Sequence, residues 1–225
     1  MLALIEAIVT VKKRPSLKPR KIPQQSRAEQ TVATILEAAA RILETRGLQG
    51  LNTNHAALRA GVSIGSLYQY FPGKDALIVA LIQRERSLFL AEAESALGEP
   101  TGRKALTHLI AVAVRQQLRR PILARLLDFE EGRPPIAKEL TQSTAAFREL
   151  IRQILTRGDL PLQPEIEIAV DDLFTIIRAM VDAAGDRGEV NREDLEQRVG
   201  RALFGYLGIL QRHVEAPRAS RQAAS

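Results

Sequence analysis

Residues 53–74, TNHAALRAGVSIGSLYQYFPGK, constrain the fold of this chain more than any other segment. They predict two short helices joined by a tight turn. Asn52 or Thr53 can cap the first helix with a side-chain oxygen, and Gly61 supplies the turn because glycine tolerates a positive φ. Ser63 can cap the second helix. Two short helices joined by a glycine-containing turn form a helix-turn-helix, whose second helix lies in the major groove of DNA. The segment therefore predicts a DNA-binding head.

The second helix of this motif is predicted to pack inward through one face and to stop abruptly. Leu67 and Phe71 lie four residues apart, so they share one side of the helix, and Val62 should pack with them. Pro72-Gly73 then breaks the helix. The residues on its opposite face are left exposed for contact with DNA.

A longer amphipathic helix precedes the motif. Apolar residues recur at helical spacing over residues 32–43, and Ser26 with Glu29 can form a capping box at the start. Gly47 is expected to end this helix. The helix-turn-helix is followed at once by another helix, so residues 26–97 are predicted to form a three-helix head and a linking helix.

The run ILEAAARILETRGLQGLNTNHAALRAGVSIGSLYQYFPGKDALI resembles the DNA-binding head of the tetracycline-repressor (TetR) family of bacterial regulators. It covers about a fifth of the chain. Its central part is specific, because glycines, aromatic residues and a lysine recur in fixed order. The matching elements are Ile35-Leu36, Ala38-Ala39, Gly47, Thr53, Ala60-Gly61-Val62-Ser63, Gly65-Ser66-Leu67-Tyr68, Tyr70-Phe71 and Lys74. The chain departs from the family at Ala56-Ala57-Leu58, where an Ile-Ala pair is more common, and in the long stretch before Ser26.

Five residues of the second helix are predicted to face DNA. Ser66 and Gln69 could hydrogen-bond base edges, and glutamine suits a bidentate contact with adenine. Ile64 could touch a thymine methyl group, and Gly65 lets the backbone approach DNA closely. The hydroxyl of Tyr68 could reach a phosphate.

Further DNA contacts are expected on either side of this helix. Tyr70 could reach a phosphate through its hydroxyl or could be a packing residue, and Lys74 adds a positive charge at the next helix start. The resemblance implies that Thr53 binds phosphate, a role compatible with capping, and that Asn54 or His55 sits at the groove edge. The second helix contains no arginine. Bidentate guanine reading from it is therefore not expected, and specificity should rest on amide side chains, DNA shape and the N-terminal arm.

Charge is distributed unevenly along the chain. Residues 12–86 contain 13 basic and 5 acidic residues, whereas residues 87–225 contain 19 basic and 20 acidic ones. A basic head is what a phosphate-binding surface requires. An acid-free arm interrupted by prolines holds Lys12, Lys13, Arg14, Lys18, Arg20, Lys21 and Arg27. The prolines predict a flexible extended segment, which either contacts phosphates or the minor groove or is a solvated tail.

Several classes of function receive no support from the residues. The chain has no cysteine, which excludes disulfides and thiolate metal sites. His55, His108 and His213 lack metal-ligand spacing, and no phosphate-binding loop is present. No apolar run approaches the roughly 18–20 residues that span a bilayer. We therefore expect a cytoplasmic, nucleoid-associated protein that needs no metal or cofactor and is neither an enzyme nor a membrane protein.

The remainder of the chain is predicted to be helical, so the fold class is all-α. Helices are expected at about residues 88–97, 106–119, 121–131, 137–157, 165–184 and 192–213. The predicted organisation is an arm at 1–25, a helix-turn-helix domain at 26–73, a ligand-binding and dimerisation bundle at 74–214 and a disordered tail at 215–225.

The resemblance implies that the last two helices pair with those of a second copy. Two-fold symmetry also suits a small head, because a dimer can read a palindromic operator. The alternative is ordinary intramolecular core, and both are expected along different stripes. The predicted interface residues are Leu173, Ile176, Ile177, Met180, Leu203, Phe204, Leu207 and Leu210.

The resemblance further implies a pocket for an unknown small-molecule effector inside the bundle. Plain core is the favoured interpretation of each candidate lining residue taken singly. The candidates are Phe89, His108, Val112, Phe129, Phe147, Ile151 and Phe174. Arg115, Asp128 and Glu131 are the polar residues expected near His108. The resulting hypothesis is a homodimeric, ligand-responsive repressor. The alternatives are a chromosome-organising or partner-recruiting DNA-binding protein, and an all-helical enzyme or interaction protein that retains the head as scaffold.

Overall fold

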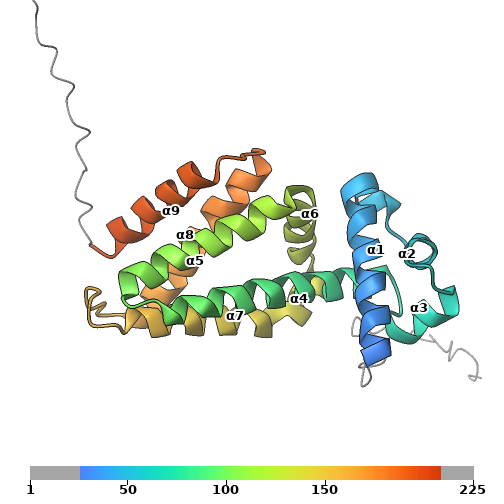
Figure 1. Cartoon of the computed structure of the whole chain (residues 1–225), viewed down its shortest axis with the longest axis horizontal. Coiled ribbons are helices and arrows are strands. Elements are labelled where there is room, and N and C mark those ends of the chain that lie inside the picture. The colour runs from blue at the N-terminus through green and yellow to red at the C-terminus, as the bar shows by residue number, and fades with distance from the viewer. Residues whose placement is uncertain (1–25, 209–225) are drawn as a thin grey trace, which may run out of the picture. The chain divides into compact units, whose positions relative to one another are not determined.

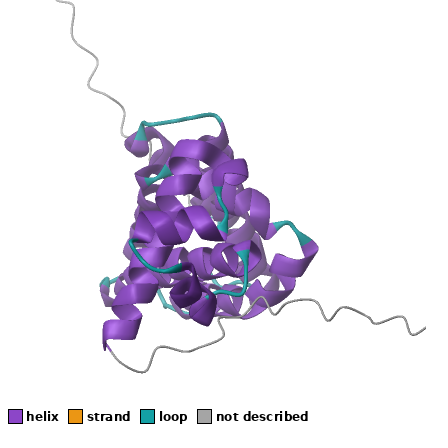
Figure 2. Ribbon diagram, turned by 90° about the vertical axis from the view of Figure 1, so that its right-hand side faces the viewer, coloured by secondary structure: helices purple, strands orange, loops and turns teal. Residues whose placement is uncertain are grey.

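The computed structural model describes residues 26–208, except for the side chains of residue 26 and of residues 141–143. In this part of the chain every regular element is a helix and there is no strand, which confirms the all-α prediction (Figures 1 and 2). The helices are α1 (Ser26–Gly50), α2 (Thr53–Ala60), α3 (Ile64–Tyr70), α4 (Lys74–Ala93), η1 (Glu94–Gly98), α5 (Gly102–Arg119), α6 (Pro121–Glu131), α7 (Pro134–Leu155), α8 (Ile166–Asp186) and α9 (Arg192–Tyr206).

The chain divides into two compact units. Within the described residues, one unit contains residues 26–85 and 126–141, and the other contains residues 86–125 and 142–208. The head is therefore built from more of the chain than the helix-turn-helix and α1. The first part of α4 and the segment that joins α6 to α7 belong to it.

Helix α1 forms because its apolar residues recur on one stripe. Ile35, Ala39 and Leu43 are fully buried in the head, as the spacing predicted. Gly47 was expected to end the helix, but the helical assignment continues across it to Gly50. Gly47 itself has φ 62° and ψ −169°, so it marks a sharp kink. The prediction located the break in the helix correctly and missed the short helical turn that follows.

The second unit is built on α5, α8 and α9, each of which packs against the other two. Leu109 of α5, Leu173 of α8 and Leu203 of α9 are fully buried where these helices meet. Burying one such side chain contributes about 1.5–3 kcal/mol, so the shared core is the main source of this unit's stability.

Helix α5 begins earlier than the apolar spacing predicted, at Gly102 instead of residue 106. Thr101 caps it by accepting a hydrogen bond from the Lys104 N–H at 3.2 Å. The carboxylate of Asp159 accepts bonds from the N–H groups of Gly102 and Arg103 at 2.7 and 3.1 Å. These acceptors satisfy the unpaired N–H groups of the first turn, so the helix extends beyond its apolar stripe.

Two further boundaries differ from the predictions. The linking helix ends at Ala93, and η1 replaces its expected last turn. Helix α9 ends at Tyr206, so the part of the predicted last helix beyond residue 208 lies outside the described residues. None of the helices in residues 26–208 is long and apolar enough to cross a bilayer.

Candidate nucleic-acid interface

The two helices of the motif start and stop through caps that the sequence suggested. Of the two candidate caps for α2, the structure selects Asn52, whose Oδ1 accepts a hydrogen bond from the His55 N–H at 2.8 Å. Gly61 ends α2 with φ 67° and ψ 28°, a left-handed conformation that favours glycine. Ser63 caps α3 by accepting from the Ser66 N–H at 3.0 Å. The turn between α2 and α3 is therefore determined locally.

Burial separates the inner and outer faces of α3. Leu67 and Phe71 are fully buried, which confirms their inward packing, and Val62 is half-buried. Ile64 is 38% exposed and Tyr68 is 41% exposed, although both are large side chains with apolar surface. Such side chains on a short helix are held outward because the opposite face is occupied by the core of the head.

The remaining small and polar positions of α3 differ in their freedom to reach another molecule. Gly65 and Gln69 are exposed. Ser66 is half-buried, and its Oγ lies 2.8 Å from the Ser63 Oγ. The hydroxyl of Ser66 would have to turn away from Ser63 to meet a base edge, so Gln69 is the better-placed hydrogen-bonding side chain on this helix.

Thr53 and Tyr68 join the start of α2 to the outer face of α3. The Thr53 Oγ1 lies 3.1 Å from the Tyr68 hydroxyl oxygen. Either hydroxyl can donate this bond, and the other hydroxyl then keeps its own proton for a second acceptor. Both residues were predicted to contact phosphate for independent reasons, and the structure brings their hydroxyls together. The pair can thus present one O–H donor to an anionic oxygen.

Two polar residues follow Thr53 on the first turn of α2. Asn54 and His55 are both exposed. The Nδ1 atom of His55 lies 2.9 Å from the Gly50 carbonyl oxygen and 3.1 Å from the Asn52 Nδ2, so the ring is held against the residues that precede the helix. The position of both side chains is compatible with the groove-edge role that the resemblance implies.

Tyr70 and Lys74 are more involved in the head itself than the sequence suggested. Tyr70 is only 8% exposed, which favours its packing interpretation over a phosphate contact. The Lys74 ammonium group donates to the carbonyl oxygen of Leu48 at 2.5 Å. Lys74 therefore ties the start of α4 to the end of α1. Periodicity could not show this, because the carbonyl group belongs to a residue 26 positions away.

The basic character of the head comes mainly from a segment outside the described residues. Residues 26–85 contain six basic and five acidic residues, whereas residues 12–21 contain six basic residues and no acidic one. Within the described part, Arg46 and Arg59 are exposed, and Arg41 pairs with Glu37 at 2.8 Å. Positive charge is thus concentrated in residues 12–21, whereas α3 is uncharged.

In the second unit, three predicted effector-pocket residues come together. The rings of Phe89 and Phe147 have centroids 4.9 Å apart, and those of Phe147 and Phe174 lie 5.7 Å apart. They come from α4, α7 and α8. The guanidinium group of Arg148 lies over the Phe174 ring, 4.6 Å from its centroid. This aromatic cluster combines apolar surface with a cation at its edge.

The other apolar candidates for the pocket are distributed differently. Val112 and Ile151 are fully buried and belong to the same core as the aromatic cluster. Phe129 was predicted to line the pocket, but it is 70% exposed on α6 and belongs to the first unit. That prediction is wrong, because helical spacing indicates an apolar stripe without showing which apolar residue lies outside it.

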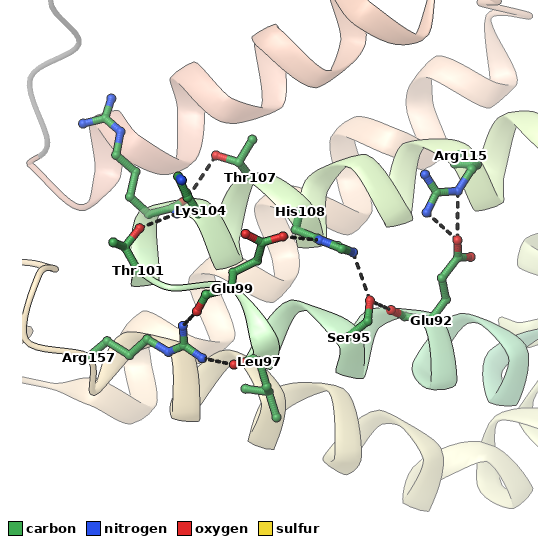
Figure 3. Close-up of polar contacts among 11 residues, drawn as sticks. Glu92, Ser95, Leu97, Glu99, Thr101, Lys104, Thr107, His108, Arg115 and Arg157 are labelled. Carbon is green, nitrogen blue, oxygen red and sulfur yellow. Dashed lines mark hydrogen bonds and ion pairs between the residues drawn. The ribbon is translucent and has the colours of Figure 1, made fainter.

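His108 is held by hydrogen bonds at both ring nitrogens (Figure 3). Its Nδ1 lies 2.9 Å from Glu99 Oε1, and its Nε2 lies 3.0 Å from Ser95 Oγ. The order of serine, histidine and carboxylate is that of a hydrolase triad. In such a triad the serine hydroxyl donates its proton to the histidine, which acts as the base. Here the Ser95 hydroxyl donates its proton to the Glu92 carbonyl at 2.6 Å, so the histidine is not placed to activate it as a nucleophile. The cluster therefore connects η1 to α5 structurally.

Arg115, which was expected near His108, pairs with the Glu92 carboxylate (Figure 3). Its Nε donates to Glu92 Oε1 at 2.9 Å. In the part of the chain that the structure describes, no group of three or more histidine and acidic side chains is arranged to hold a metal ion.

Two family models match the chain over the regions just described. The model of the bacterial regulatory proteins of the tetR family matches residues 35–81, and that of the tetracyclin repressor-like C-terminal domain matches residues 103–207. The chain belongs to the TetR family.

The chain is also similar to individual curated proteins. The chain is 28% identical over 171 residues to the transcriptional repressor DrrR1 of Streptomyces coeruleorubidus, covering 76% of this chain and 57% of DrrR1. It is 26% identical over 145 residues to the nucleoid occlusion factor SlmA of Haemophilus influenzae, covering 64% of this chain and 59% of SlmA. These matches span less than two thirds of either curated relative.

A solved TetR-family structure shows the likeness in three dimensions. The transcriptional regulator from Streptomyces coelicolor superposes with a TM-score of 0.62 at 25% identity, covering 82% of this chain and 99% of that one. The similarity therefore extends over both the head and the bundle of a TetR-family protein.

The residues expected at a TetR-family dimer interface fall into three groups. Leu173, Ile177, Leu203, Phe204 and Leu207 are buried in the core of the single chain. Ile176 and Met180 are half-buried, and Leu210 lies outside the described residues. A side chain buried within its own protomer has little surface left to cover a partner, so among the described residues Ile176 and Met180 keep the interface prediction. The prediction for Leu210 is untested. Ile168 and Tyr206, which were not among the predicted residues, are 54% and 41% exposed on α8 and α9.

Proposed function

We propose that the chain is a sequence-specific DNA-binding transcriptional regulator that binds a palindromic operator as a homodimer. The observation that carries this proposal is the outer face of α3. It presents Ile64, Gly65 and Gln69 beside the paired hydroxyls of Thr53 and Tyr68, while Leu67 and Phe71 hold the helix from behind. Apolar and amide groups suit base edges, and hydroxyl donors suit phosphates.

The electrostatic part of binding is assigned to the arm. Residues 12–21 carry six positive charges without an acidic residue, and α3 carries none. Neutralising phosphates releases counterions, which gives affinity that depends on salt and not on sequence. In this division of roles the arm supplies attraction to any DNA of the nucleoid, and α2 and α3 select the operator.

A homodimer is proposed because one short helix contacts too few base pairs for specificity. Two heads related by a two-fold axis would read the two halves of a palindrome. Ile176 and Met180 support this proposal, since they lie four residues apart on α8 and are half-exposed in the single chain. A partner helix would bury the rest of their surface.

A small-molecule effector is proposed for the aromatic cluster of Phe89, Phe147 and Phe174. A ligand with a planar or aliphatic apolar body would suit these rings, and the guanidinium group of Arg148 suits an electronegative end. DrrR1 is named a repressor, and repression is the proposed direction of control for this chain.

The similarity to SlmA favours a second candidate function. A nucleoid occlusion factor is named for an action on the nucleoid, and a chromosome-organising DNA-binding protein would use the same head. The two candidates differ in what releases the DNA. A regulator should lose operator affinity when a saturating small molecule is added, whereas an organising protein should not respond.

The test of the leading proposal is fluorescence anisotropy with the intergenic DNA beside the protein's own gene, across a salt series. Thr53→Val and Tyr68→Phe each remove one hydroxyl, and each should weaken binding about three- to tenfold, because one hydrogen bond contributes about 0.5–1.5 kcal/mol. Thr107→Val is the control, since its exposed hydroxyl donates only to the Arg103 carbonyl within α5.

Three outcomes decide between the candidates. Tight binding of two protomers to a palindrome, weakened by both substitutions and unchanged in the control, would support the regulator. Weak binding that ignores sequence and disappears at moderate salt would support an organising role. A folded dimer that binds no DNA would refute both proposals.

A further inference from the structure

Arg133 connects three helices of the head unit. Its backbone N–H donates to the Glu130 carbonyl at the end of α6, and its carbonyl accepts from Ile136 and Ala137 in the first turn of α7 at 2.9 Å. Its side chain reaches Asp75, the second residue of α4, where Nη2 donates to Oδ1 at 2.6 Å. The guanidinium group therefore extends from a point whose backbone is fixed on both sides.

The same guanidinium group also covers a buried carboxylate. Its Nε donates to Glu130 Oε2 at 2.6 Å, and Glu130 is only 6% exposed. A buried carboxylate is unfavourable unless it is paired, so Arg133 is held in place by Glu130 while it binds Asp75. The hydrogen bond to Asp75 is the main cause that raises the pKa of Arg133, so the guanidinium group stays charged across the physiological pH range.

Asp75 lies at the start of α4, where the position of that helix is set. The adjacent Lys74 donates to the Leu48 carbonyl at the end of α1, so the first turn of α4 is bonded to α1 on one side and to the α6–α7 turn on the other. Helix α3 ends at Tyr70, and only residues 71–73 separate it from α4. Because Phe71 is fully buried, this connection has little freedom to absorb a shift of α4.

The geometry points to Arg133 as a positioning residue for DNA recognition. Through Asp75 it holds the first turn of α4, and through that turn it sets the orientation of α3. This inference rests on the proposed DNA-binding function. It places a determinant of operator affinity about 60 residues beyond the helix-turn-helix, in a turn where no contact with DNA is required.

The test compares operator affinity and its salt dependence in Arg133→Gln, Asp75→Asn and the double variant. Each single variant should lose about tenfold in affinity, and the double variant should lose no more than Arg133→Gln does, because both changes remove the same Arg133–Asp75 bond. The slope of log affinity against log salt should stay unchanged. An arginine that contacted phosphate directly would lower that slope by about one when replaced.

Arg152→Gln is the matched control. Arg152 pairs with Glu149 three residues earlier and with Glu167 of another helix at 2.5 Å, so it repeats the arrangement of Arg133 in the second unit. Its side chain is 32% exposed, against 38% for Arg133. Its partner carboxylates are more exposed than Glu130, so removing it should lower thermal stability less than Arg133→Gln does, and it should not change operator affinity. Equal losses of affinity in both variants would overturn the inference, because general destabilisation would explain them.

Asp75→Asn provides a variant that keeps the buried pair intact. It replaces the charged acceptor with a neutral amide, so the charge-assisted bond is lost from the other side. Arg133 keeps its bond to Glu130, so this variant tests the inference even where Arg133→Gln fails to fold. If the wild-type protein binds operator DNA and folded Asp75→Asn binds it with the same affinity, this inference is overturned and the proposed function stands. Failure of the wild-type protein to bind operator DNA would overturn the proposed function and this inference together.

Discussion

Replacing Gly102 with alanine should destabilise the second unit through one defined contact. A Cβ atom at this position would lie 2.7 Å from both Cγ and Cδ1 of Leu160 and 3.1 Å from Asp159 Oδ1. Carbon atoms pack favourably at about 3.5–4.0 Å, so Leu160 must move by about 1 Å. Its Cγ is the branch point of the side chain, and a change of rotamer at the tip cannot relieve the clash.

The expected loss follows from two opposing effects. Overpacking of this kind costs about 1–3 kcal/mol, whereas exchanging glycine for alanine at a compatible position stabilises by about 0.4–1 kcal/mol. The net expectation is a loss of about 1–2 kcal/mol. Displacing Asp159 would add to the loss, because its carboxylate accepts from the N–H groups at the start of α5.

Urea titration followed by far-ultraviolet circular dichroism measures this loss, with Gly98→Ala as the matched control. A Cβ at Gly98 would meet nothing within 4 Å, so that variant should be as stable as the wild type or more so. In the double variant with Leu160→Ala, the loss of unfolding free energy should be smaller than the sum of the two single losses, because the shortened side chain no longer meets the new Cβ. A Gly102→Ala protein as stable as the wild type, or additive effects in the double variant, would refute the argument.

Three further predictions concern a cap, a pH dependence and the arm. Ser63→Ala should cost about 1 kcal/mol of unfolding free energy, since it removes the acceptor for the first turn of α3; an unchanged urea midpoint would contradict this. The hydrogen bond from the Gly102 N–H is the main cause that lowers the pKa of Asp159 below its ordinary value of 3.8. The charged carboxylate therefore stabilises the folded state above pH 3.8, and that stabilisation is lost as the pH falls through the lowered pKa. Asp159→Asn should therefore lower the melting temperature at pH 7, and the difference from the wild type should shrink below pH 3.8; a constant difference would exclude the carboxylate as the cause. Replacing the six basic residues of segment 12–21 with glutamine should reduce the salt slope of operator binding by up to about five, measured by anisotropy, whereas an unchanged slope would assign the arm to solubility alone.

The helix-turn-helix could be predicted closely because its determinants are local. Asn52, Gly61 and Ser63 act on backbone groups within a few residues, so a cap or a left-handed turn is visible in the sequence. Leu67 and Phe71 could be assigned to the inner face because four residues make about one helical turn. The all-α class follows from the same periodicity along the rest of the chain.

Other features depended on residues far apart in the sequence. Helix α5 begins at Gly102 because Asp159, more than 50 residues later, accepts its N–H groups. Lys74 has the residue type of a phosphate ligand, yet it donates to the carbonyl of Leu48. Phe129 has the character of a core residue and lies on the surface. Apolar spacing identifies a stripe on a helix, but the partner that covers the stripe is chosen by the packing of other helices.

For this TetR-family protein, the sequence alone therefore determined where its helices begin, turn and face inward around the motif, since those choices are made by neighbouring residues. Only the tertiary structure decided which hydroxyls, carboxylates and arginines meet. The pairing of Thr53 with Tyr68 and the link from Arg133 to Asp75 arise when helices distant in the chain pack together, and hydrogen bonds form only between groups that packing brings within about 3 Å.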